Sequence, residues 1–415
     1  MRITISSPDG LGDFILRIPM IRALLAEGHE LQLLLRRPAA DLVATVFPGV
    51  ERLEIAADPY HAETRRKKNP FLKEHLAIEK FQPDLYVASL FSLNFFDEVW
   101  FEHDQWKVPA AGFSTTDSFW PSGTIADPVA LAEAFRINVR VPVALPELEK
   151  NRLLGSAILG RDLPHESPRL EPGEEALATA RETLQRNGLS EGEYWIACVG
   201  ARSGIVMKDW GEENWRVFFA EVIPQGKRPV VFLGNPKEWE SIERIRNANF
   251  HSINLASDPP PIPVSLALAS LSSGYVGRDS GVMHLASAAG RPVLAVYGGG
   301  HWGRFLPSSG PALVTTRPVT CRGCDFSCPY EKPWCITDVR IETMRAAWER
   351  LPLASDVEVL EDSSGPDRTL LHPLEARKLA HSAQINRQKN ELRERSKTFP
   401  SRLAGNLLSR WTGQS

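Results

Sequence analysis

The beginning of the chain alternates short apolar runs with amphipathic stretches. Arg2–Ser6 alternates and is rich in β-branched residues, which predicts a strand, and residues 13–26 predict a helix. Residues 31–35 are apolar apart from one Gln, as in a parallel strand that is buried on both faces. Further strands are expected at 52–55 and 85–90, with a helix at 39–47. Strands that alternate with helices predict right-handed βαβ units and a doubly wound sheet.

The same alternation returns in the second half of the chain. Helices are expected at 174–187, 212–222, 239–248, 262–272 and 281–289, and strands at 194–199, 229–233, 274–277 and 292–297. Between about 114 and 170 the pattern breaks up and becomes rich in Pro and Ser, which indicates substrate-facing insertions and a linker. We therefore predict an α/β protein with two Rossmann-like doubly wound domains, residues 1–170 and 171–352, followed by a tail, 353–415. Ligands are expected in a central cleft faced by the carboxyl ends of both sets of strands.

Length and charge add limits to this picture. A chain of 415 residues is too long for one ordinary core, since domains above ~250–300 residues tend to split. The net charge of -3 argues against a general nucleic-acid binder. Residues 367–415 carry ten basic and four acidic side chains, so a basic tail follows an acidic body. No apolar run approaches the ~20 residues that span a bilayer, and no signal-peptide pattern follows Met1, so we expect a cytoplasmic protein.

The first loop with candidate chemistry is Gly10-Leu11-Gly12-Asp13, which follows the first predicted strand. A dinucleotide fingerprint would need a third glycine at position 15, where this chain has Ile15. The sequence therefore disfavours an NAD-dependent oxidoreductase. Asp13 at the start of the helix is either a helix cap or a general base that deprotonates a hydroxyl.

The second loop, Gly277 to His284, joins a predicted strand to a helix. Backbone N–H groups and the positive end of the helix make this a ready anion site, and Ser280 and Gly281 would let a phosphate approach closely. His284 is either a donor to that phosphate or a packing histidine. Asp279 is expected to fix the loop, because like charges repel.

Two further stretches follow predicted strands. Lys208 and Arg202 are suited to neutralising a diphosphate, although an exposed Lys is often only solvated, and Ser203 is a further donor-binding candidate. Glu238 is either the acceptor for a ribose diol or a carboxylate at a helix start.

Together these stretches resemble the bacterial heptosyltransferase family, glycosyltransferase family 9. The segment from Asp279 to Pro292 resembles the signature of that family, and the Gly12-Asp13 loop with Pro19 resembles its N-terminal motif. Lys208-Asp209-Trp210 is similar to its K-x-W segment, and Gly234 to Glu238 to its G-G-P-x-E loop. The resemblance runs from residue 1 to about residue 350.

The resemblance implies the GT-B fold and an inverting transfer, typically of heptose from ADP-heptose to the inner core of lipopolysaccharide. It implies a nucleotide-sugar donor and a glycan or lipid-linked acceptor, with no cofactor required for catalysis. By the same resemblance Asp13 would activate the acceptor hydroxyl, Lys208, Ser280, Gly281 and His284 would hold the diphosphate, and Glu238 the ribose. An inverting transfer needs one base and positive charge at the leaving group, which agrees with these residue types.

One departure keeps the donor open. Where the family usually has Gly-Pro-Thr, this chain has Gly298-Gly299-Gly300, so a Thr hydroxyl near the expected donor site is missing. Transfer of another nucleotide sugar, onto a glycan or a protein, is therefore an alternative. A non-catalytic nucleotide-sugar-binding scaffold is a second alternative, although such a module needs no base like Asp13.

Four of the five cysteines lie within fifteen residues, at positions Cys321, Cys324, Cys328 and Cys335. Clustered thiols in a cytoplasmic protein more often bind a metal than form disulfides. The set would suit structural zinc, or iron, with free thiols or a reversible disulfide as the alternative. Cys198 lies in an apolar strand and is expected in the core.

The tail has its own pattern. Residues 356–373 are expected to form a linker and residues 374–392 a helix. Residues 397–411 space apolar side chains three to four apart with flanking arginines, which fits either an interfacial helix on the inner membrane or a solvated tail.

Overall fold

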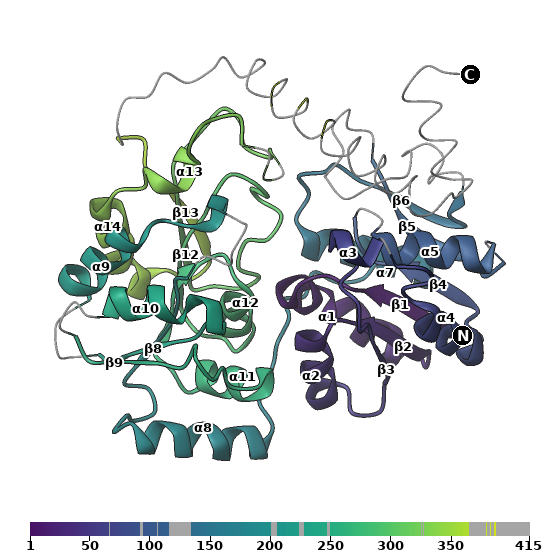
Figure 1. Cartoon of the computed structure of the whole chain (residues 1–415), viewed down its shortest axis with the longest axis horizontal. Helices are drawn as coiled ribbons and strands as arrows, with labels where there is room; N and C mark the ends of the chain where they lie inside the picture. The colour runs from purple at the N-terminus through teal and green to yellow at the C-terminus, as the bar shows by residue number, and fades with distance from the viewer. Residues whose placement is uncertain are drawn as a thin grey trace. The chain divides into compact units, whose positions relative to one another are not determined.

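The protein consists of two compact units, shown in the computed structural model of Figure 1. The first unit holds Met1–Glu166, and the second begins at Ser167. The structure describes residues 1–65, 67–91, 94–105, 107–115, 134–200, 206–223, 228–246, 250–324, 326, 328–364, 379, 382 and 386. The predicted helices at 374–392 and 397–411 therefore lie almost entirely outside the described residues.

The first unit is built on a six-stranded parallel sheet. Its strands are β1 (Arg2–Ser7), β2 (Glu30–Leu35), β3 (Glu51–Glu54), β4 (Leu85–Ala88), β5 (Ala110–Ser114) and β6 (Ile137–Arg140). Its helices are α1 (Leu11–Ala26), α2 (Arg37–Val46), α3 (Ala62–Arg65), α4 (Leu72–Phe81), α5 (Phe95–Asp104) and α7 (Glu147–Leu159). The strand order, β3-β2-β1-β4-β5-β6, is the doubly wound Rossmann order.

A ladder of polar side chains runs from β1 through β2 to the edge strand β3 and explains the one Gln in an apolar run. Thr4 Oγ1 donates to Gln32 Oε1 at 3.0 Å, and Gln32 Nε2 donates to Glu51 Oε1 at 2.7 Å. Thr4 and Gln32 face each other in the parallel register of β1 and β2. Both are fully buried, so the hydrogen bonds compensate for the loss of water.

The expectation of an irregular segment from 114 to 170 is wrong for part of its length. The structure has β6 there and the 13-residue helix α7, which packs against α1. The buried face of α7 carries Glu147, Lys150 and Asn151, and Lys150 Nζ lies 2.6 Å from Glu147 Oε1. Because a buried ion pair replaces apolar residues on that face, the helix lacks the apolar periodicity that would predict it.

The second unit repeats the architecture with a seven-stranded parallel sheet. Its strands are β7 (Trp195–Cys198), β8 (Val230–Phe232), β9 (Ser252–Asn254), β10 (Gly274–Arg278), β11 (Val293–Val296), β12 (Ala312–Thr316) and β13 (Val357–Glu361). Their order is β13-β12-β11-β10-β7-β8-β9, so the first six strands again follow the Rossmann order.

The helices of the second unit connect these strands. They are α8 (Glu174–Arg186), η1 (Val206–Lys208), α9 (Glu212–Val217), η2 (Phe218–Val222), η3 (Pro236–Glu238), α10 (Trp239–Arg246), α11 (Ile262–Ser270), α12 (Gly281–Ala288), α13 (Trp334–Thr337), α14 (Ile341–Arg350) and η4 (Leu351–Leu353). The single helix expected at 212–222 is an α-helix that continues as a π-helical turn.

The expected linker from residue 356 instead begins with a strand of the sheet. β13 pairs in parallel with β12, Ala312 facing Val357 and Thr316 facing Glu361. Asp362 follows, and its carboxylate accepts the backbone N–H of Arg340 at 2.8 Å. The strand escaped prediction because its side chains are only half-buried to exposed, as on the edge of a sheet.

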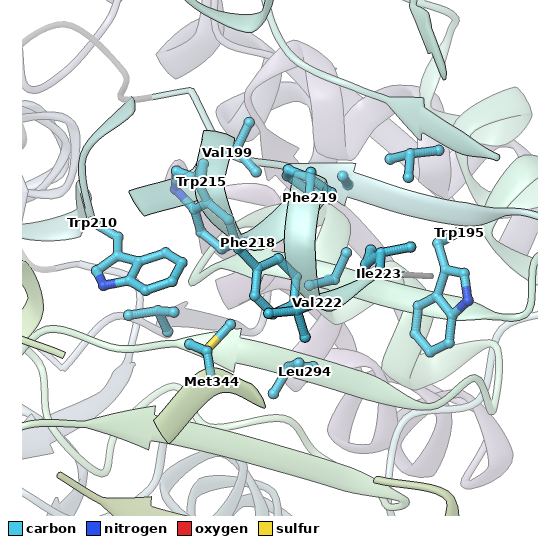
Figure 2. Close-up of a cluster of buried hydrophobic side chains, with 14 of the residues drawn as sticks. Trp195, Val199, Trp210, Trp215, Phe218, Phe219, Val222, Ile223, Leu294 and Met344 are labelled. Atoms are coloured by element: carbon cyan, nitrogen blue, oxygen red, sulfur yellow. The ribbon is translucent and has the colours of Figure 1, made fainter. Parts of the chain in front are cut away.

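An aromatic core fixes the segment that follows Lys208. Trp210, Trp215 and Phe218 lie in one buried cluster with Met344 from α14 (Figure 2). The rings of Trp210 and Trp215 meet edge to face, with centroids 4.7 Å apart. Trp210 Nε1 donates to the carbonyl oxygen of Val339 at 2.6 Å. The segment Lys208-Asp209-Trp210 is therefore anchored in the core by its third residue.

In each sheet the strand order reverses at one point, and open α/β sheets bind ligands outside the carboxyl ends of the strands there. The reversal lies between β1 and β4 in the first unit and between β7 and β10 in the second. The loop to Asp13 follows β1, the segment to Lys208 follows β7, and Asp279 follows β10. Among the residues that the structure describes, none of the helices could cross a membrane.

Candidate functional site

The loop after β1 places Asp13 in the first turn of α1. Gly10 is the N-cap, and Asp13 Oδ2 accepts its backbone N–H at 3.2 Å, which is the one hydrogen bond of a capping box that a glycine N-cap allows. Gly12 lies in the same turn. Asp13 is half-buried, so its carboxylate stays near solvent. The structure thus gives Asp13 the capping contact, and this contact leaves room for the proposed base function, because a carboxylate can accept several hydrogen bonds.

Directly beneath that turn lies a buried ion pair that the sequence did not predict. Arg17 Nη2 lies 2.8 Å from Asp9 Oδ2 and donates to the carbonyl oxygen of Ser89 at 3.2 Å, and Arg17 Nε donates to Asn151 at 3.2 Å. Burial alone would lower the pKa of Arg17, but the charge and hydrogen bond of Asp9 outweigh it and the pKa is raised. Arg17 also interacts electrostatically with the carboxylate of Asp13.

A second buried carboxylate lies at the end of β1. Asp97 accepts hydrogen bonds from Ser6 Oγ at 2.5 Å, Tyr86 Oη at 2.7 Å and Asn94 Nδ2 at 2.6 Å. Burial raises its pKa to about 6, although these donors favour the ionised form. The network joins β1, β4 and α5 and so fixes the strand from which the Asp13 loop begins.

In the second unit, the residues of the predicted anion site lie at the N-terminus of α12. Ser280 is its N-cap, and Ser280 Oγ accepts the N–H of Met283 at 3.3 Å. His284 lies in the first turn and is 2% exposed, and its Nδ1 has no hydrogen-bond partner among the residues that the structure describes. Burial, assisted by Lys208, lowers the pKa of His284 to about 4 despite the opposing charge of Asp279. The ring is therefore neutral at pH 7.

Lys208 is paired with Asp279 in this structure. Lys208 Nζ lies 2.6 Å from Asp279 Oδ2. Burial alone would raise the pKa of Asp279, but Lys208 and the histidines His284 and His301 outweigh it, so the pKa is lowered. Asp279 thus holds the Lys208 ammonium beside the start of α12, which agrees with a loop-fixing function.

Glu238 is buried at the neighbouring strand end. Its Oε1 accepts from Arg278 Nη2 at 2.9 Å and its Oε2 from the N–H of Asn235 at 3.0 Å. A Cβ at Gly200 would lie 2.6 Å from Glu238 Cβ, so that glycine gives the side chain its space. Arg278 therefore connects Glu238 to the loop of Asp279. Arg202 and Ser203 lie outside the described residues.

The four clustered cysteines lie within the second unit. Cys321, Cys324 and Cys335 are buried and Cys328 is half-buried. Burial, with the neighbouring thiols, raises the pKa of Cys321 to about 12, and burial raises that of Cys335 to about 11. The thiols interact electrostatically, yet within the described part of the chain no three His, Cys, Asp or Glu side chains are grouped to hold a metal ion. The four thiols have the donor chemistry of a site for a thiolate-binding metal. Cys198 lies in the core, as expected.

The geometry defines what the second unit can do. The N-terminal turn of α12, one ammonium and one neutral imidazole lie together at the strand-order reversal, and the imidazole Nδ1 has no partner among the described residues. All three favour an anion with several oxygens, such as a phosphate or diphosphate. Sequence reasoning found these residues but missed the Asp9–Arg17 pair and Asp97, whose partners are distant along the chain.

Comparison with known proteins gives a family match over part of the chain. Residues 128–324 match the sequence model described as glycosyltransferase family 9 (heptosyltransferase). No curated protein matches the chain by sequence. The match confirms the resemblance that the motifs indicated.

Several solved structures share the fold. The ADP-heptose lps heptosyltransferase II of E. coli has 18% identity and a TM-score of 0.61, over 85% of this chain and 99% of that one. The family 9 glycosyl transferase of Veillonella parvula has 15% identity and a TM-score of 0.64, over 85% and 97%. E. coli heptosyltransferase WaaC with ADP has 17% identity and a TM-score of 0.57, over 85% and 100%. At these identities the likeness shows the fold alone, and the expected α/β fold of the GT-B type is confirmed.

Proposed function

We propose that this glycosyltransferase transfers heptose from ADP-heptose, with inversion, to a lipopolysaccharide-core or other glycan acceptor. The match of residues 128–324 to glycosyltransferase family 9 (heptosyltransferase) supports this. Two similar structures support the donor, because one is an ADP-heptose lps heptosyltransferase and the other is a heptosyltransferase with ADP. The alternative of another nucleotide sugar is an outcome of the test below.

The observation that carries the proposal is the anion site at the start of α12. The N–H groups beyond Ser280, the Gly281 backbone and the unpartnered nitrogen of His284 would bind the diphosphate. Lys208 would neutralise the charge that develops when the sugar leaves, and Glu238 would accept the ribose hydroxyls.

The transfer would then be a single displacement. Asp13 would take the proton of the acceptor hydroxyl as its oxygen bonds to the anomeric carbon. The bond from that carbon to the phosphate oxygen breaks, and the diphosphate leaves with the electron pair. The buried Arg17–Asp9 pair beneath Asp13 would hold the turn that carries the base in place.

The first test measures binding of ADP, UDP, GDP and NAD by calorimetry. We expect selective ADP binding that weakens at least tenfold in Lys208→Ala, because a charge-assisted contact contributes about 1.5–3 kcal/mol. Lys237→Ala is the matched control, since Lys237 is exposed and close to Glu238. Preference for UDP or GDP would discard heptose. Tight NAD binding that is indifferent to Lys208 would contradict the proposal.

The second test separates catalysis from binding. Asp13→Asn keeps the capping oxygen and the size of the side chain but cannot act as a base. We expect the variant to bind ADP with unchanged affinity and to lose turnover by about 10²–10⁴-fold. A variant that retains its function would identify a binding scaffold instead of an enzyme.

The proposal has two further parts. The four clustered cysteines would hold a structural zinc or iron, which measurement of the metal content of the purified protein tests. We expect one metal per chain, lost in Cys321→Ser and kept in Cys198→Ser, and a metal-free wild type would contradict this part of the proposal.

We also propose a cytoplasmic protein whose residues 367–415 bind the inner membrane. Deleting them should abolish partitioning into anionic vesicles, and unchanged partitioning would contradict it.

A further inference from the structure

The three consecutive glycines after β11 form a crossing point between the Lys208 segment and the cysteine-containing loop, residues 321–335. A Cβ at Gly298 would lie 2.1 Å from the carbonyl oxygen of Met207, and a Cβ at Gly300 would lie 2.4 Å from the ring of Phe326. The carbonyl oxygen of Gly299 accepts the N–H of Gly323 at 2.8 Å. The glycines are thus needed because two segments approach the backbone where a side chain would be.

Phe326 lies at the centre of this crossing in an unusual conformation. Its φ is +59°, which a bulky residue adopts only when its surroundings enforce it. One such contact is His301, whose ring centroid lies 4.3 Å from that of Phe326. The strained backbone and the space at Gly300 together bring the ring to one position.

That position is beneath the ammonium of the candidate donor site. Lys208 Nζ lies 5.7 Å from the centroid of the Phe326 ring, within the range of a cation–π interaction. The same Nζ is paired with Asp279 at 2.6 Å. Lys208 is therefore held from two sides, and removing either contact would let a long side chain with several rotamers move away.

We propose that Phe326 is a positioning residue of the donor site: its ring face, admitted by Gly300, holds the Lys208 ammonium where it meets the diphosphate. The cysteine-containing loop thereby contributes to nucleotide binding through a residue that is not a cysteine. The identity of the anion rests on the proposed function, but the contact between Phe326 and Lys208 does not.

The first experiment tests the contact without any nucleotide. The rate at which an amine-reactive reagent labels Lys208 is measured by mass spectrometry in the wild type, Phe326→Leu and Phe326→Tyr. We expect labelling to be about two- to fivefold faster in Phe326→Leu and near the wild-type rate in Phe326→Tyr, because a tyrosine ring keeps the cation–π contact. Equal rates in the wild type and Phe326→Leu would overturn the proposal.

The second experiment changes the space that Gly300 leaves for the Phe326 ring and the electronics of the ring itself. Gly300→Ala displaces the ring and should weaken ADP binding about two- to fivefold, like Phe326→Leu, with no further loss in the double variant. Gly299→Ala is the matched control, because its Cβ would meet only ordinary contacts at 3.5 Å. Phenylalanine with one, two or three ring fluorines at position 326 keeps the shape and should weaken ADP binding in steps.

The outcomes separate the two proposals. Faster labelling of Lys208 in Phe326→Leu, in a protein that does not bind ADP, would support the positioning contact and contradict the proposed donor. ADP binding that is equal in Gly299→Ala, Gly300→Ala and the fluorinated proteins would overturn the function of Phe326 and leave the donor standing.

Discussion

The buried imidazole of His284 should make the stability of the protein depend on pH in a defined direction. Its pKa in the folded protein is about 4, against 6.5 for an unperturbed histidine, and burial is the main cause. Between these two values the unfolded chain binds a proton that the folded protein does not. The stabilisation is therefore fully present above pH 6.5 and is lost as the pH falls toward 4.

The magnitude follows from the size of the shift. A difference of about 2.5 pKa units corresponds to about 3 kcal/mol over the whole range, and about 2 kcal/mol of it is lost between pH 8 and pH 5. The ring is fully buried, so solvent screening does not reduce this figure substantially. In His284→Gln the residue no longer titrates, and this part of the pH dependence should disappear.

Urea unfolding at pH 5, 6.5 and 8 measures the effect. All other groups titrate in both proteins, so the difference between wild type and His284→Gln isolates this residue. We expect that difference to shift by about 2 kcal/mol between pH 8 and pH 5. Parallel pH profiles would show that the ring is protonated or exposed in the folded protein, and would refute the reasoning. A diphosphate near the ring would raise its pKa, so ADP binding at pH 5.5 should take up protons, which calorimetry in two buffers detects.

Three other perturbations test the packing. Asp97→Asn should remove a pH effect whose sign is opposite to that of His284. The raised pKa of about 6 makes the wild type lose up to about 3 kcal/mol of stability as the pH rises from 4 to 6. Urea unfolding profiles that stay unchanged in the variant would contradict this. Trp210→Phe should cost about 1–3 kcal/mol more than Trp215→Phe, since only the indole N–H of Trp210 has a partner, and equal melting temperatures would disprove the difference. Gly298→Ala should cost about 1–3 kcal/mol by overpacking, whereas Gly49→Ala, with open space around it, should leave the melting temperature unchanged; similar values for both would exclude the steric explanation.

The central strands could be predicted from sequence because both of their faces are buried. Apolar or β-branched residues predominate in β1, β2, β10 and β11, and nearly every position is buried, so a short window is enough to find them. Edge strands carry less signal. β6 alternates between half-buried and exposed positions in a polar sequence, and it was missed. Helix α1 begins two residues before the predicted start, because Gly10 caps it and Asp13 is its third residue.

The residues of the candidate site also differ in how far a local sequence pattern indicates them. Asp13, Lys208, Ser280 and His284 were found because each follows a strand within a loop whose glycines and polar residues form a local pattern. The hydrogen bond from Ser6 to Asp97 joins residues 91 positions apart, and no local pattern indicates it. The pairing of Lys208 with Asp279 was likewise out of reach, because only the parallel alignment of β7 with β10 brings the two together.

The edge strand β13 determines where the protein can be shortened. A chain that ended at residue 352, near the end of the family resemblance, would lack β13 and leave one side of β12 without its partner. The side chains of β12 are fully buried in the intact protein. Without β13, the unpaired N–H and C=O groups of β12 would form a template on which strands of other chains can pair. Such a fragment should aggregate, whereas a chain that ends after Ser364 keeps β13 and the contact between Asp362 and Arg340. The boundary for expressing a well-behaved shortened enzyme therefore lies beyond the last motif that identifies the family.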